Sequence, residues 1–145
     1  MNRKEAKTTI INEFITNFNS TTPVCLENNE NFYICTTPLT LTTKPTSNPW
    51  VRFTIKNNVT YQKTFGKEGS RRWRRTGFIA AKVFIPENTG TYAGDNLCEE
   101  IVSIFEGKRL GDIVFEEGKY EEIGQTDDML FLYSVIIYFS FDETK

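Results

Sequence analysis

TGFIAAKVFIP, residues 76–86, and LFLYSVIIYFSF, residues 130–141, decide the fold of this 145-residue chain. Both stretches are rich in β-branched and aromatic residues, which are typical of strands. The first leaves almost no polar face, which indicates a central strand buried on both sides of a sheet. The second is also largely apolar on both faces. The sequence therefore predicts a sheet with residues 76–86 as a central strand and residues 130–141 as a further long strand.

Two amphipathic helices are predicted outside these strands. Apolar residues recur at helical spacing over residues 6–18 and again over residues 93–105. Thr91 is a suitable N-cap for the second helix, and Asp95 lies in its early turns, where a negative charge suits the helix dipole. Gly107 is well placed to end this helix.

Shorter strands complete the expected sheet. Five segments have the composition or the alternation of strands: 24–26, 32–35, 50–56, 112–116 and 120–125. Asn57-Asn58 is interpreted as a turn into another short strand through Tyr61, and Gly118 as the turn of a hairpin. Because strands and helices do not alternate one by one, residues 1–145 are expected to form a single α+β domain. Its two helices would cover one face of a mainly antiparallel or mixed sheet.

The composition restricts the classes of function. Hydrophobic residues make up 39% and charged residues 25% of the chain, and the net charge of −2 neither requires nor excludes a nucleic-acid partner. There is no histidine, which removes the commonest general base and metal ligand, so neither an enzyme nor a cofactor is expected. Cys25, Cys35 and Cys98 are widely spaced and odd in number, which favours free thiols. No signal peptide or membrane-spanning helix is apparent, so no membrane partner is expected.

The strongest local signal is a basic cluster around a tryptophan. Its members are Arg71, Arg72, Trp73, Arg74 and Arg75, and the glycines and charges before them predict an exposed, mobile loop over residues 65–75. Arginine binds carboxylate and phosphate groups through paired hydrogen bonds. The loop is therefore interpreted as a contact with a neighbouring subunit, with a solvated loop and a nucleic-acid contact as alternatives.

An acidic cluster supplies a matching surface for a subunit contact. It consists of Glu116, Glu117, Glu121 and Glu122, and with the basic cluster it forms the set of interface or lumen candidates. A second acidic group, Asp127-Asp128 with Asp142-Glu143, has the ligand type of a divalent-metal site. Solvated turn residues are the favoured interpretation there. No catalytic, cofactor-binding or metal-ligating residue is predicted.

The number of aromatic residues favours self-assembly. Phe, Tyr and Trp make up 14% of the chain, and two helices on one side of a sheet hide only one of its faces. Large apolar patches on a single subunit are a liability unless assembly covers them. We therefore expect a homo-oligomer, for which a closed ring is one natural outcome of head-to-tail contacts.

Several short motifs follow the N-terminal helix in a definite order. They are Thr22-Pro23-Val24, Glu27-Asn28-Asn29-Glu30-Asn31-Phe32, Asn48-Pro49-Trp50-Val51-Arg52-Phe53, Arg75-Thr76-Gly77-Phe78-Ile79, Val83-Phe84-Ile85-Pro86, Gly90 and Ile104-Phe105, which closes the second helix. This order resembles that of the tail terminator and minor-tail-protein family of siphoviruses, and the resemblance covers nearly the whole chain.

The resemblance implies a structural virion protein and no catalytic residues. Such a subunit forms a hexameric ring that caps the tail tube protein, ends tube polymerisation and then meets the head-neck connector protein, while DNA passes through the hole. It would be assembled in the host bacterial cytoplasm and located at the tail-head junction. Another head–tail connector or neck protein is an alternative, and a nucleic-acid-binding module is a further one. A small hydrolase or transferase ranks last.

Overall fold

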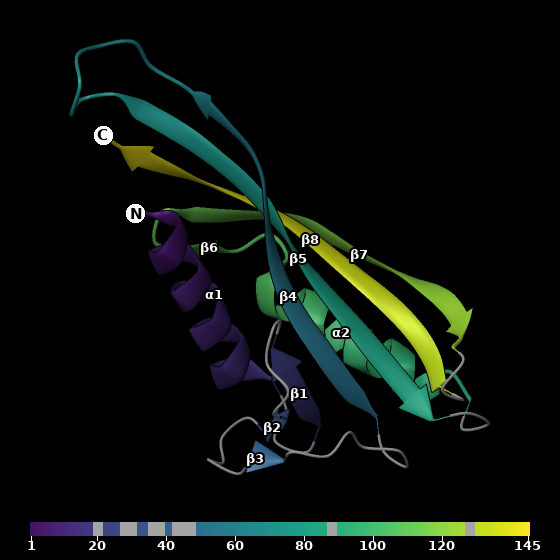
Figure 1. Cartoon of the computed structure of the whole chain (residues 1–145). Coiled ribbons are helices and arrows are strands. Elements are labelled where there is room, and N and C mark those ends of the chain that lie inside the picture. Colours follow the sequence, from purple (N-terminus) through teal and green to yellow (C-terminus); the bar gives the residue numbers. More distant parts are fainter. Residues whose placement is uncertain (19–21, 27–31, 35–39, 42–48, 87–89, 127–129) are drawn as a thin grey trace.

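The computed structural model describes residues 1–18, 22–26, 32–34, 40–41, 49–86, 90–126 and 130–145, with only the backbone considered at 32–34 and 40–41. Two helices and eight strands are assigned in these residues (Figure 1). The helices are α1 (Arg3–Asn17) and α2 (Tyr92–Phe105). The strands are β1 (Pro23–Leu26), β2 (Phe32–Ile34), β3 (Thr40–Leu41), β4 (Trp50–Gln62), β5 (Arg72–Pro86), β6 (Arg109–Leu110), β7 (Ile113–Gln125) and β8 (Leu130–Thr144).

The strands form one mixed sheet in the order β3-β2-β1-β4-β5-β8-β7-β6. The pairing of β1 with β4 is parallel and the other pairings are antiparallel. The two apolar segments 76–86 and 130–141 belong to β5 and β8, which pair with each other near the centre of the sheet. The predicted α+β fold with two helices and a mixed sheet is thus confirmed.

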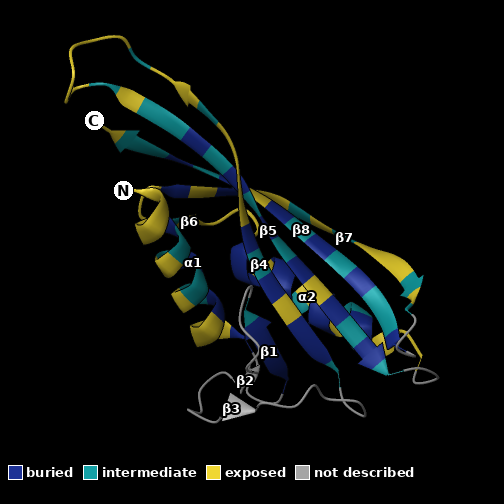
Figure 2. Ribbon diagram, viewed as in Figure 1, coloured by how far each residue is buried: buried dark blue, intermediate teal, exposed yellow. Residues whose placement is uncertain are grey.

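The main core lies between the helices and one face of the sheet (Figure 2). Along β5 and β8 the odd-numbered side chains from Ile79 to Ile85 and from Tyr133 to Phe141 are buried on this face. The ring of Phe14 from α1 stacks on Phe53 of β4 with centroids 4.2 Å apart and on Phe105 of α2 at 6.4 Å. Both helices therefore pack on the same side.

The helix ends follow from local sequence. Asn2 caps α1: its side chain accepts a 2.8 Å hydrogen bond from the Glu5 amide, and the Glu5 carboxylate accepts one of 3.0 Å from the Asn2 amide. Thr91 is the N-cap of α2, as predicted, although its side chain makes no capping hydrogen bond. Gly107 follows the C-cap with φ +68°, a conformation that favours glycine.

The predicted turns at Asn57-Asn58 and Gly118 are wrong, because both positions lie inside long strands. β4 continues to Gln62 with a register shift between Asn57 and Thr60, and β7 continues with a shift between Phe115 and Gly118. Gly118 is a close-packing position: a Cβ there would lie 3.1 Å from a Val102 methyl of α2. Its amide also donates a 2.8 Å hydrogen bond to Glu106.

Burial on both faces of β5 is also corrected. Its odd-numbered residues from Arg75 to Ile85 are buried, whereas the even-numbered ones are half-buried and Lys82 is exposed. The helices cover one face only, so apolar residues on the other face stay partly accessible. We call that second face of β4, β5, β8 and β7 the open face.

Candidate functional site

A projecting arm carries the basic cluster. Beyond the helices, the end of β4, the start of β5 and the end of β8 continue together away from the body of the protein (Figure 1). We define the arm as residues 57–76 and 140–145. It contains seven cationic and three acidic side chains. Figure 2 shows that exposed residues predominate along its β4 side.

Arg72, Trp73, Arg74 and Arg75 are strand residues, which corrects the predicted loop over 65–75. Arg74 pairs with Tyr61 of β4 and with Asp142 of β8, so the start of β5 is bonded on both sides. The loop itself is shorter and lies between β4 and β5. This strand has charged residues on both faces: Arg72 and Arg74 lie on one face beside Asp142, and Arg75 lies on the other beside Glu143. The apolar alternation typical of a strand is therefore missing.

Asp142 is the centre of the charged group on the open face of the arm. Its carboxylate accepts hydrogen bonds of 2.8 Å from Arg74 Nε and 2.8 Å from Arg72 Nη2, and Lys63 Nζ lies 3.8 Å away. The hydrogen bond from Arg74 is the main cause that lowers the pKa of Asp142 below its usual value. Three cations thus share one carboxylate.

The opposite face of the arm is closed by a second ion pair. Arg75 is 6% exposed, and its Nε donates to Glu143. Thr60 accepts hydrogen bonds from Arg75 and, at 2.9 Å, from Arg3 of α1. The base of the arm is therefore tied to the first turn of the N-terminal helix.

The tip of the arm presents an aromatic ring to solvent. Phe65 is 98% exposed, and Gly66 and Gly69 beside it have φ values of +149° and +91°. The tip is nevertheless held by its own hydrogen bonds. Arg71 Nε donates to the Gly66 carbonyl at 3.0 Å, and the Thr64 hydroxyl accepts from the Arg72 amide at 2.9 Å.

The side chains on the open face of the sheet change in charge and polarity from β4 to β7. One row across it reads Arg52, Lys82, Ser134 and Glu121, and the next reads Thr54, Ala80, Ile136 and Lys119. A third row pairs Phe78 with Tyr138, whose ring centroids are 6.0 Å apart. The face is therefore basic on the β4 and β5 side and apolar along the middle, and on β7 these rows place Glu121 next to Lys119.

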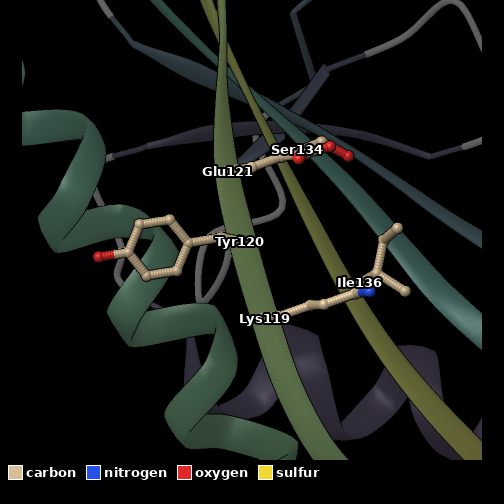
Figure 3. Close-up of a pocket in the computed structure, with 5 residues that line it drawn as sticks. All are labelled: Lys119, Tyr120, Glu121, Ser134 and Ile136. Atoms are coloured by element: carbon tan, nitrogen blue, oxygen red, sulfur yellow. The ribbon is translucent and has the colours of Figure 1, made fainter.

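The four predicted glutamates all lie exposed on β7. Glu116 and Glu117 occupy the first register shift, while Glu121 and Glu122 follow further along the strand. Beside Glu121 a depression of about 150 Å³ opens between β7 and β8 (Figure 3). Lys119, Ser134 and Ile136 line it with Glu121, and Figure 3 shows Tyr120 turned the other way, toward α2.

The structure does not bring the two predicted clusters together within one chain. The arginines bind Asp142 and Glu143, which the sequence predicts to be solvated. Glu121 pairs with Ser134, eight residues before Asp142 along β8. At about 3.4 Å per residue, that is about 27 Å along the strand. The signal missed in the sequence was the alternation of Arg72 and Arg74 with Trp73 and Arg75.

Of the remaining predicted positions, the structure describes two cysteines. Cys25 and Cys98 are buried free thiols, and burial raises the pKa of Cys98 to about 12. Cys35 and the Asp127-Asp128 pair lie outside the described residues. Among the residues that the structure describes, no group of three or more acidic or cysteine side chains is placed to hold a metal. Within the same residues, no helix has the length and apolar character needed to cross a membrane.

Comparisons with known proteins support the fold alone. No protein-family model matches the chain, and no curated protein matches its sequence. One solved structure, of a protein that bears only a serial designation, aligns over 97% of this chain and 96% of its own with a TM-score of 0.64. The two sequences are 11% identical, so this likeness concerns the arrangement of helices and strands.

Proposed function

We propose that the chain is a structural subunit that assembles with copies of itself into a ring capping the tail tube of a long-tailed phage. The ring ends tube polymerisation and offers its other side to the head-neck connector. Capping requires one surface that fits the last ring of the tube and another that rejects a further tube subunit. The chemistry is that of complementary surfaces, without a catalytic step.

The open face is the observation that carries this proposal. Phe78, Ile136 and Tyr138 lie partly accessible in its middle, and Tyr138 is 40% exposed. Four strands about 4.8 Å apart, over five rows about 6.8 Å apart, give this face a planar area of roughly 650 Å². A standard protein interface buries about 800 Å² on each partner, so the face with the arm is large enough for a subunit contact.

The ion pairs of the arm argue against its use as a nucleic-acid site. Arg72 and Arg74 are hydrogen-bonded to Asp142, and Arg75 is buried against Glu143. A phosphate would have to displace these carboxylates or share the arginines with them. A steep loss of DNA affinity with rising salt would favour the nucleic-acid alternative. Weak DNA binding that is unchanged in the Arg72→Ala, Arg74→Ala double variant would exclude the nucleic-acid alternative.

Two measurements test the proposal. Light scattering of the purified chain, alone and with tail tubes, should give a mass of about six subunits on the tube. A strict monomer that ignores the tube contradicts the proposal. Electron microscopy of particles lacking the protein should show overlong tails, whereas tailless heads would identify a neck connector instead.

A further inference from the structure

We infer that the arm of one copy docks on the open face of a second copy, with the ring of Phe65 in the depression beside Ile136. This inference rests on the proposed self-assembly and names the contact that would produce it. The occupant is a segment of this same chain, so no other protein is needed to complete the surface.

The first argument is the exposure of Phe65. A side chain that is 98% exposed contributes nothing to the core of its own chain. The turn that carries it is held by hydrogen bonds from Arg71 to Gly66 and from the Arg72 amide to Thr64. A preorganised turn loses little conformational entropy on binding, so a ring held in this way suits an anchor for a partner.

The second argument is the size and lining of the depression. Its volume is about 150 Å³, and a cavity of about this size accepts a benzene molecule. Ile136 offers an apolar wall, and Lys119 in the lining provides a cation that an aromatic face attracts, while Glu121 and Ser134 supply polar groups. The volume therefore suits an aromatic ring, and Ile136 and Lys119 are the side chains that would contact it favourably.

The third argument is charge. The arm has seven cationic and three acidic side chains, whereas β7 has four acidic side chains and one cation. Opposite net charges on the two surfaces draw copies together and fix their register. The depression itself is lined by Glu121 and Lys119, which are opposite in charge to Lys67 and Glu68 beside Phe65 at the tip. Glu122 pairs with the buried Tyr133, so it lies on the helix side of β7 and takes no part in this contact.

The fourth argument is distance. The arm extends away from the depression, which lies about 27 Å from Asp142 along β8 at about 3.4 Å per residue. The arm cannot reach its own depression because the three paired strands hold it straight. The two surfaces can only meet between copies.

The test compares three full-length chains by sedimentation equilibrium over a concentration series. Phe65→Ser should weaken self-association about tenfold to a hundredfold, the range expected for withdrawing a buried aromatic side chain. Tyr92→Ser is the matched control, since Tyr92 is an aromatic residue 80% exposed at the start of α2, and it should leave self-association unchanged. Circular dichroism should show that all three chains are folded, because neither side chain packs in the core.

Cross-linking checks the geometry while keeping Phe65 in place. A Glu68→Cys chain is mixed with a Ser134→Cys chain and treated with a short bismaleimide, and a mixed dimer above the background of the native cysteines is expected. A Tyr92→Cys chain mixed with the Ser134→Cys chain should give only that background. Adding Phe65→Ser to the Glu68→Cys chain should remove the mixed dimer.

The outcomes separate this contact from the proposed function. If all three chains associate equally and Glu68→Cys gives no mixed dimer, the arm contact is wrong although the chain self-assembles. If the native chain stays monomeric at every concentration and on tail tubes, both proposals fall. A contact that Tyr92→Ser weakens as much as Phe65→Ser also overturns the assignment of Phe65.

Discussion

Replacing Asp142 with asparagine should loosen the arm while the body of the protein stays folded. The Asp142 side chain is 18% exposed and accepts hydrogen bonds from Arg72 and Arg74, with Lys63 nearby. A hydrogen bond to a charged group contributes about 1.5–3 kcal/mol when shielded from water, and an exposed ion pair about 0–1 kcal/mol. Arg74 is 30% exposed and Arg72 is 53% exposed, so only the Arg74 contact falls toward the first range.

We therefore expect Asp142→Asn to lower the free energy of opening the arm by about 1–2 kcal/mol. This corresponds to a loss of about tenfold in the hydrogen-exchange protection of its amides. Native-state hydrogen exchange of the amides at residues 72–76 and 140–144 measures this. Glu68→Gln is the control, because it removes the same charge at the exposed tip. Unchanged protection of the arm amides in Asp142→Asn would refute the assignment of Asp142 as the centre of the arm.

The effect of Asp142→Asn should depend on pH in a defined direction. The pKa of Asp142 is lowered in the folded chain, so its carboxylate stabilises the arm above its unfolded pKa of about 3.8. That stabilisation is lost as the pH falls through the lower, folded pKa. The difference between the native chain and Asp142→Asn should thus be complete at neutral pH and disappear below that folded pKa. A difference that persists when Asp142 is protonated would show that charge is not its cause.

Three further outcomes are expected. Gly94→Ala should lower the free energy of unfolding by about 1–3 kcal/mol in chemical denaturation. The new Cβ would lie 2.2 Å from the Tyr133 ring and 2.7 Å from Ile85, and this overlap outweighs the gain in helix propensity. An unchanged denaturation midpoint would show that α2 can shift. Cys98 should resist iodoacetamide at pH 8 in the folded chain and react on unfolding, since its pKa is about 12, and rapid labelling of the folded chain would contradict its burial. Tyr138→Lys should weaken self-association yet change the free energy of unfolding by less than about 0.5 kcal/mol, and light scattering with denaturation measures both.

The sequence predicted the helices and strands whose buried residues recur at regular spacing. It missed the features that arise only when strands pair with one another. α2 and the centres of β5 and β8 followed from periodicity, because their buried residues recur at fixed spacing. Gly118 was misassigned because glycine marks both turns and close contacts with a helix, and only the position of Val102 distinguishes them. Asp142 was missed as the partner of Arg74 because the two are 68 residues apart and meet only through strand pairing.

The arm also bears on the symmetry of any assembly. A two-fold dimer would satisfy both arms and both depressions within one pair and would then stop, with identical surfaces at its two ends. A cap must differ between its two sides, because one side meets the tube and the other meets the neck. Head-to-tail contacts, in which each arm reaches the next copy, give such a polar ring. The arm contact is thus compatible with capping only if the assembly on the tube contains more than two subunits. A stable dimer held by reciprocal Phe65 contacts would exclude the ring, although it would confirm that the arm binds a second copy.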